Sequence, residues 1–159
     1  MGIIQKLFSV LLIITCSFNK LFSQDVIRQK PCNNPIISAQ ADSIKELYAK
    51  QGFAVVRESS VSMESEYEVP VILPLAEGSW YQFVFIGDIS SKLYEVRMYD
   101  WSEKQVVYQK KTRGDQDANI INFSYIPPSS EHYMIKPLQV NKMKKDELCG
   151  YVILMKKMK

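Results

Sequence analysis

The stretch that decides the fold is residues 61–75, which read VSMESEYEVPVILPL. Apolar side chains recur there at nearly every second position, with charged or polar ones between them. A period of two is typical of a half-buried strand. Pro70 and Pro74 have no N–H to donate to a ladder, so they indicate an edge or a bend. The predicted core face carries Val61, Met63, Tyr67, Val69, Val71, Leu73 and Leu75.

The alternation continues to the end of the chain. Turn residues interrupt it roughly every 10 to 15 positions, which gives about eight strands. Strands do not alternate with helices, and this excludes a parallel α/β sheet. We therefore predict an all-β fold, an antiparallel, jelly-roll-like β-sandwich. The later strands are marked by Tyr81/Phe83/Phe85, Tyr94/Val96/Met98, Val106/Tyr108, Ile121/Phe123/Tyr125, Tyr133/Ile135 and Tyr151/Ile153/Met155.

One amphipathic helix is predicted over residues 38–51, before the strands. Ser38 or Asp42 can cap its start, and Gly52 stands where a helix stop is expected. A lone amphipathic helix of this kind covers a sheet edge or a barrel end. Its apolar stripe is Ile37, Ala41, Ile44, Leu47 and Tyr48.

The N-terminus has the features of a cleavable signal peptide over residues 1–23. Lys6 supplies the positive start, residues 7–15 form an apolar run too short to span a bilayer, and Ser23 offers a cleavage site. The ending before Gln24 resembles signal peptides of secreted Bacteroidetes proteins. We predict a secreted or periplasmic protein with a signal peptide, an N-terminal arm (24–36) and a helix plus β-sandwich domain (37–159).

Two alternatives concern the same segment. An uncleaved N-terminal anchor is disfavoured because Lys20 follows the apolar run closely. Lipidation of Cys16 is a minor alternative, since Thr15 stands where lipoprotein signals carry a smaller residue. With cleavage after Ser23, Lys and Arg fall from 20 to 18 against 17 acids. A charge of about +1 gives no electrostatic reason to expect nucleic acid or a membrane surface as partner.

Cleavage after Ser23 also leaves an even pair of cysteines, Cys32 and Cys149. In an exported protein such a pair predicts a disulfide, which would pin the N-terminal arm to the last strand. The alternative is two buried free thiols. A zinc site is not expected, because two Cys and one distant His lack ligand spacing.

Residues 75–155 carry a family resemblance. The matching pieces are Leu75-x-x-Gly78-x-Trp80-Tyr81-x-Phe83, the run Glu95-Val96-Arg97-Met98-Tyr99-Asp100, Phe123-x-Tyr125-x-Pro127 and Glu131-His132-Tyr133-Met134-Ile135. In this order they resemble the bacterial pre-peptidase C-terminal domains and the related Golgi-dynamics (GOLD) sandwiches. The resemblance implies an exported, non-catalytic sandwich domain.

Residues able to carry catalysis are few, and neither a cofactor nor a metal is expected. His132 is the only histidine, and we interpret it as a structural or surface residue. Asp88 and Asp100 are interpreted as turn formers. The Asp115-x-Asp117-x-Asn119 spacing resembles the start of a Ca²⁺ loop but lacks the later Gly and Glu, so we expect a plain hairpin loop.

Three aromatic residues, Trp80, Tyr99 and Trp101, are the candidate ligand-binding residues, because exposed rings on a sandwich can stack on sugars. The alternative for Trp101, which begins a turn, is that it caps the core. The leading hypothesis is an exported, non-catalytic β-sandwich domain that acts through protein or cell-surface contacts. The alternative is a small carbohydrate-binding module, which coplanar Trp80 and Trp101 would favour. A hydrolase is the third hypothesis and would need convergent carboxylates around His132.

The signal-peptide interpretation predicts that the exported protein starts at Gln24. Intact-mass analysis of protein recovered from the medium or periplasm measures this directly. A mass that still includes residues 1–23, or a lipid on Cys16, would contradict it.

Overall fold

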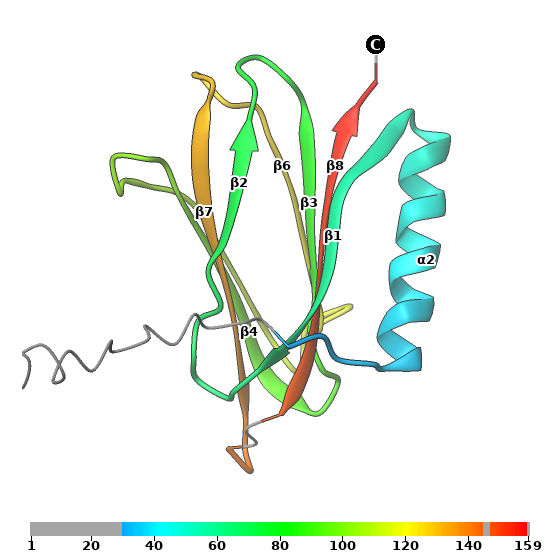
Figure 1. Ribbon diagram of the computed structural model, residues 1–159. Coiled ribbons are helices and arrows are strands. Elements are labelled where there is room, and N and C mark those ends of the chain that lie inside the picture. Colours follow the sequence, from blue (N-terminus) through cyan, green and yellow to red (C-terminus); the bar gives the residue numbers. More distant parts are fainter. Residues whose placement is uncertain (1–29, 145–146, 159) are drawn as a thin grey trace, which may run out of the picture.

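The computed structural model describes residues 30–144 and 147–158, and it is an antiparallel β-sandwich with one helix (Figure 1). One sheet has the order β1-β8-β3-β6 and the other β2-β7-β4-β5. The elements are α2 (Pro35–Lys50), β1 (Phe53–Met63), β2 (Val71–Leu75), β3 (Tyr81–Ile86), β4 (Ser91–Tyr99), β5 (Gln105–Thr112), β6 (Ile120–Tyr125), β7 (Glu131–Asn141) and β8 (Leu148–Lys157).

The strand order is that of a jelly roll. Only β4 and β5 are neighbours both in sequence and in a sheet, and every other connection passes from one sheet to the other. All the strand pairs are antiparallel. The predicted fold class and strand number are therefore confirmed.

The single strand predicted over residues 61–75 is wrong, because the chain changes sheet within it. β1 ends at Met63 and β2 begins at Val71. Between them the backbone turns at Glu66, whose φ is 76°, and Tyr67 points away from the core with 66% of its surface exposed. The backbone N–H groups of Glu66 and Val69 donate to the carbonyl groups of Gln139 and Pro137. The alternating sequence therefore continues through the connection, although the chain passes there from the first sheet to the second.

The main core lies between the two sheets, as the alternation predicts. Each strand contributes its inward-facing side chains, and the largest fully buried ones include Tyr94 and Tyr133. The predicted core residues of the aromatic strand β3 are buried too. These inward side chains include Phe83, Phe85, Tyr94, Val96, Met98, Phe123, Tyr133, Ile135, Val152 and Leu154.

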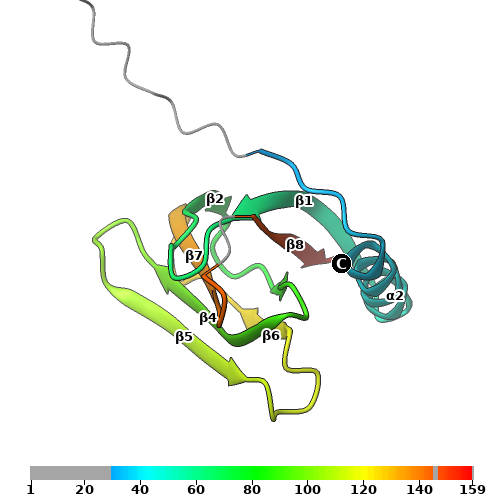
Figure 2. The same ribbon diagram turned by 90° about the horizontal axis from the view of Figure 1, so that it is seen from below.

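Helix α2 covers the outer face of the β1-β8-β3-β6 sheet, here called the helix-side sheet (Figures 1 and 2). It begins at Pro35, earlier than predicted, because Asn34 caps it by accepting hydrogen bonds from the N–H groups of Ile36 and Ile37. The predicted caps Ser38 and Asp42 lie inside the helix. Its stop at Gly52, with φ +80°, is as predicted.

A second apolar cluster lies between α2 and the helix-side sheet. Ile37 and Ala41 of the helix are buried in it, whereas Leu47, which was predicted to lie on the apolar stripe, is exposed. Ile153 and Met155 of β8 face this cluster rather than the space between the sheets. β3 is therefore buried on both faces, and its burial exceeds the half-buried pattern predicted for it. Within the described residues no helix is long and apolar enough to cross a membrane.

A disulfide joins the N-terminal arm to the last strand. Cys32 and Cys149 are bonded, with their Cα atoms 5.6 Å apart. The carbonyl group of Cys149 accepts a hydrogen bond of 3.2 Å from the buried side chain of Gln139 in β7. The disulfide thus holds the residues before α2 to β8, the strand that lies under the helix. The predicted signal peptide (1–23) and Cys16 lie outside the described residues.

Removal of this disulfide should destabilise the fold strongly. The bonded residues are 117 apart in sequence. A cross-link that closes so long a loop restricts the unfolded chain and stabilises the folded state by about 4–5 kcal/mol. We expect the Cys32→Ala/Cys149→Ala variant to melt more than about 10 °C below the wild type by scanning calorimetry. As a control, reductant should lower the melting temperature of the wild type but not of the variant. Two titratable thiols in the native protein would contradict this expectation.

Candidate ligand-binding face

The outer face of the β2-β7-β4-β5 sheet, here called the open sheet, lies on the side of the sandwich away from α2 (Figure 2). Because side chains alternate along a strand, the residues between the buried Tyr94, Val96 and Met98 point outward from the centre of this sheet. Strand pairing sets β5 and β7 residues beside them. The open face is defined by Glu95, Arg97, Tyr99, Tyr108, Lys110, Met134 and Lys136.

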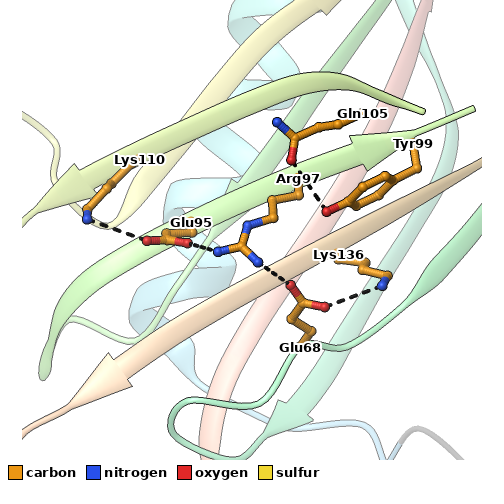
Figure 3. A network of polar contacts seen from close by, with 7 residues as sticks. All are labelled: Glu68, Glu95, Arg97, Tyr99, Gln105, Lys110 and Lys136. Atoms are coloured by element: carbon orange, nitrogen blue, oxygen red, sulfur yellow. Dashed lines mark hydrogen bonds and ion pairs between the residues drawn. The ribbon is translucent and has the colours of Figure 1, made fainter. Parts of the chain in front are cut away.

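A continuous network of ion pairs crosses the open face (Figure 3). The Arg97 guanidinium donates to Glu95 at 2.8 Å and to Glu68 at 3.0 Å. Lys110 lies 3.6 Å from Glu95, and Lys136 lies 3.4 Å from Glu68. Glu68 belongs to the connection between β1 and β2, so the network fastens that connection to the sheet.

Arg97 is the centre of the network and stays charged. Desolvation alone would lower its pKa, but the hydrogen bond to Glu95 and the charges of Glu95 and Glu68 together raise the pKa above the usual arginine value. The guanidinium also lies over the ring of Tyr108, 5.8 Å from its centroid. Held from three directions, this side chain is fixed in place before any ligand arrives.

Tyr99 lies at the end of the network nearest the β4–β5 turn. Its hydroxyl group donates to Gln105 at 3.4 Å, and the Lys136 ammonium lies 5.2 Å from its ring centroid. Tyr99 as a whole is half-buried. Tyr108 pairs with Arg97 across β4 and β5, and Tyr99 lies two positions further along β4, so two aromatic side chains lie next to Arg97.

The three aromatic residues predicted as ligand-binding do not form one cluster. Tyr99 lies on the open face, and Trp101 follows it in the β4–β5 turn with 66% of its surface exposed. The Trp101 ring contacts His132, with 5.6 Å between centroids. Trp80 lies at the start of the helix-side sheet, edge-on to Phe53 at 5.5 Å. Among the ring contacts of the described residues, none joins Trp80 to Trp101.

Trp80 borders a separate groove of about 890 Å³ at the end of the sandwich, beside Lys157. The Lys157 ammonium lies 5.2 Å from the Phe53 ring centroid and 5.9 Å from that of Trp80. It also donates to the carbonyl group of Gln51 at the C-terminal end of α2. This lysine therefore joins the end of β8 to the α2–β1 turn, which is a structural role.

The sequence interpretation missed most of the open face. Glu95-x-Arg97-x-Tyr99 alternates along one strand, and that local signal could have indicated a shared polar face. Glu68 could not have been found in this way, because it comes 29 residues before Arg97 and reaches it only through the sheet change.

The other predicted chemistry-bearing residues have local roles. Asp88 accepts hydrogen bonds from Ser90, and Asp100 accepts from the backbone of the β4–β5 turn. Asp115 accepts from Thr112 inside its hairpin loop. No group of three or more His, Cys, Asp or Glu side chains able to hold a metal occurs within residues 30–144 and 147–158.

No family model matches the sequence, and no curated protein is similar to it at a significant level. Solved structures resemble this chain only at low similarity. A structure described as "CBM4 structure and function" has a TM-score of 0.40 and 12% identity, over 67% of this chain and 79% of its own. The K3 cleaved adhesin domain of Lys-gingipain from Porphyromonas gingivalis W83 has a TM-score of 0.40 and 10% identity, over 63% and 72%. TmCBM61 in complex with β-1,4-galactotriose has a TM-score of 0.36 and 12% identity, over 68% and 84%. These values are too low to indicate a shared ligand.

The ion-pair network predicts that replacing Arg97 lowers the stability of the fold strongly. In Arg97→Leu the Glu95 side chain, only 9% exposed, loses its 2.8 Å partner and keeps only the more distant Lys110 at 3.6 Å. We expect a loss of about 2–3 kcal/mol in the free energy of unfolding, measured by urea titration. The matched change Lys136→Leu removes a partner of the more exposed Glu68 and should cost less than about 1 kcal/mol. Equal losses in the two variants would show that Glu95 does not depend on Arg97.

Proposed function

We propose that this chain is an exported, non-catalytic β-sandwich domain that binds a protein partner at the cell surface through its open face. The observation that carries this proposal is the fixed Arg97 between Glu95 and Glu68, with Tyr99 and Tyr108 beside it.

The composition of this face supports a protein partner. Tyrosine, arginine, tryptophan and methionine are the side chains most enriched in protein interfaces, and the first two supply much of the binding energy. Here Arg97, Tyr99 and Tyr108 lie together in the middle of a sheet, with Met134 paired to Tyr99. Because the ion pairs already order these side chains, a partner would meet a face that loses little conformational entropy on binding.

The disulfide supports the exported location. Bonds such as Cys32–Cys149 persist in secreted and periplasmic proteins and are rare in the cytosol. This agrees with cleavage of residues 1–23, which we include in the proposal together with the arm at 24–36 and the domain at 37–159.

A carbohydrate ligand is the second candidate, and the exposure of Trp101 is the observation that favours it. An exposed indole next to a half-buried tyrosine can stack on a sugar ring. Of the three aromatic residues predicted from the sequence, Trp80 belongs to the other sheet, so Tyr99 and Trp101 are the two that could make such contacts together. His132 packs on Trp101 at this corner.

The proposal predicts that the open face carries binding to native cell envelopes. Labelled mature protein should bind saturably, and Tyr99→Ala/Tyr108→Ala should weaken binding by at least about tenfold because two interface anchors are lost. Val56→Ala, an exposed change on the helix-side sheet, is the control and should stay within about twofold of the wild type.

Treatment of the envelopes separates the two candidate ligands. Protease treatment should abolish binding to a protein partner, and deglycosylation should leave it intact. Loss on deglycosylation alone, with protease-resistant binding, would favour the carbohydrate candidate. Equal binding by the wild type and the double tyrosine variant would refute a role for the open face.

A further inference from the structure

β6 differs from the other edge strands of the sandwich. Four strands lie at sheet edges, namely β1, β6, β2 and β5. Natural proteins protect such edges with bulges, prolines or lysines, because an exposed edge pairs readily with another strand. β1 has a register shift between Val55 and Arg57, β2 contains Pro74, and β5 carries Lys110 and Lys111. β6 reads IINFSY and pairs with β3 without any shift, so it has none of these protections.

Among the residues that the structure describes, the outward backbone groups of β6 have no hydrogen-bonding partner at this edge. The N–H group of Gly87 donates to the carbonyl group of Asn119 at 2.8 Å. Because hydrogen-bonded and non-hydrogen-bonded pairs alternate along an antiparallel ladder, this bond determines which β6 residues are hydrogen-bonded to β3. Accordingly, Ile121, Phe123 and Tyr125 exchange hydrogen bonds with β3. The N–H and C=O groups of Asn122 and Ser124 therefore point away from the sheet, where an added strand would pair with them.

A groove runs beside this edge, between β6 and helix α2. It has a volume of about 650 Å³, and its walls are mainly apolar. Ile36, Ala39 and Ile44 line it from the helix and Ile120 lines it from β6, while Gln40, Ser43 and Asp117 are the polar residues at its border. Ile36 is 52% exposed although it lies in a helix that packs on the sheet. A strand placed against β6 would direct the side chains at its helix-facing positions toward this groove, and those beside Ile120 would lie closest to it.

We propose that the β6 edge is a second docking site, which takes an extended segment of a partner protein as an added strand. Backbone hydrogen bonds to Asn122 and Ser124 would hold the segment, and apolar side chains at alternate positions would fill the groove, as in strand addition generally. This site lies on the helix-side sheet, so it is independent of the open face.

A second copy of this chain fits the groove poorly. Antiparallel pairing of β6 with β6 requires a twofold axis perpendicular to the sheet, which keeps the same faces together. The copy would then place its own Asn122 and Ser124 side chains over the apolar groove. Burying these amide and hydroxyl groups among Ile36, Ile44 and Ile120 would be unfavourable. A partner segment with apolar residues at alternate positions would bury no amide or hydroxyl side chain in the groove.

The test is selection of random eight-residue peptides displayed on phage against the immobilised mature chain. We expect enriched peptides with apolar residues at alternate positions and no central proline. Ile36→Glu should weaken the best synthetic peptide by at least about tenfold, because it places a charge in the groove. The change is tolerated by the fold, since Ile36 is exposed and an acid suits the first turn of a helix. Leu47→Glu is the matched control, being 54% exposed on α2 outside the groove, and should change affinity less than about twofold.

A second measurement locates the bound peptide. Hydrogen exchange of the amide groups of Asn122 and Ser124 should slow by at least about tenfold on binding, while Tyr108 should be unaffected. The proposal is overturned if no alternating peptide is enriched, if Ile36→Glu and Leu47→Glu weaken binding equally, or if protection maps to the open face. It is also overturned if the protein is a dimer that Ile36→Glu dissociates, since a second copy would then occupy the edge.

Discussion

The packing of helix α2 on one sheet is the constraint on which the rest of the structure depends. A sandwich of two four-stranded sheets buries one face of each sheet and leaves two outer faces in solvent. α2 removes one of these by burying Ile37 and Ala41 against the residues of β3 and β8 that point away from the main core. The Cys32–Cys149 disulfide fixes the chain just before the helix to β8. The open sheet is consequently where a broad outer surface is left free.

The side chains of the open face are held in place by ion pairs, which the burial of Glu95 makes necessary. Glu95 is largely removed from water, and an unpaired carboxylate at that position would be unfavourable. Arg97 and Lys110 compensate it, and Arg97 at the same time holds Glu68 of the β1–β2 connection. The segment that changes sheet is thus fastened across the face that we propose as the binding surface. Arg97 thus contributes to the order of the site and, together with Lys136 and the backbone hydrogen bonds of Glu66 and Val69, to the stability of the connection.

The alternation of apolar and polar side chains made the fold class predictable. Where the chain passes from one sheet to the other, the same alternation did not predict strand ends or the burial of single residues. Met63, Val71 and Leu73 face the core as expected, but Tyr67 continues the same pattern and is exposed, because the pattern does not record which sheet a segment joins. The helix stripe was predicted correctly at Ile37 and Ala41, yet the double burial of β3 could not be read from Gln82 or Val84. Tyr99 was found because it is aromatic. Glu68 and Arg97 meet only in three dimensions, so local spacing could not pair them.

The jelly-roll order also explains why β6 is accessible. β5 and β6 follow each other in sequence and lie at corresponding edges of opposite sheets. The β5 edge is exposed on its outer side and carries lysines, as an edge in solvent requires. β6 lies beside α2, and the helix packs mainly over β1, β8 and β3. It reaches the outer face of β6 at Ile120 and through the hydrogen bond that the Asn122 side chain donates to Tyr48. A helix shifted by one strand would have closed the groove between Ile36 and Ile120. The uncharged sequence of β6 is therefore what an edge would carry if another strand completes it.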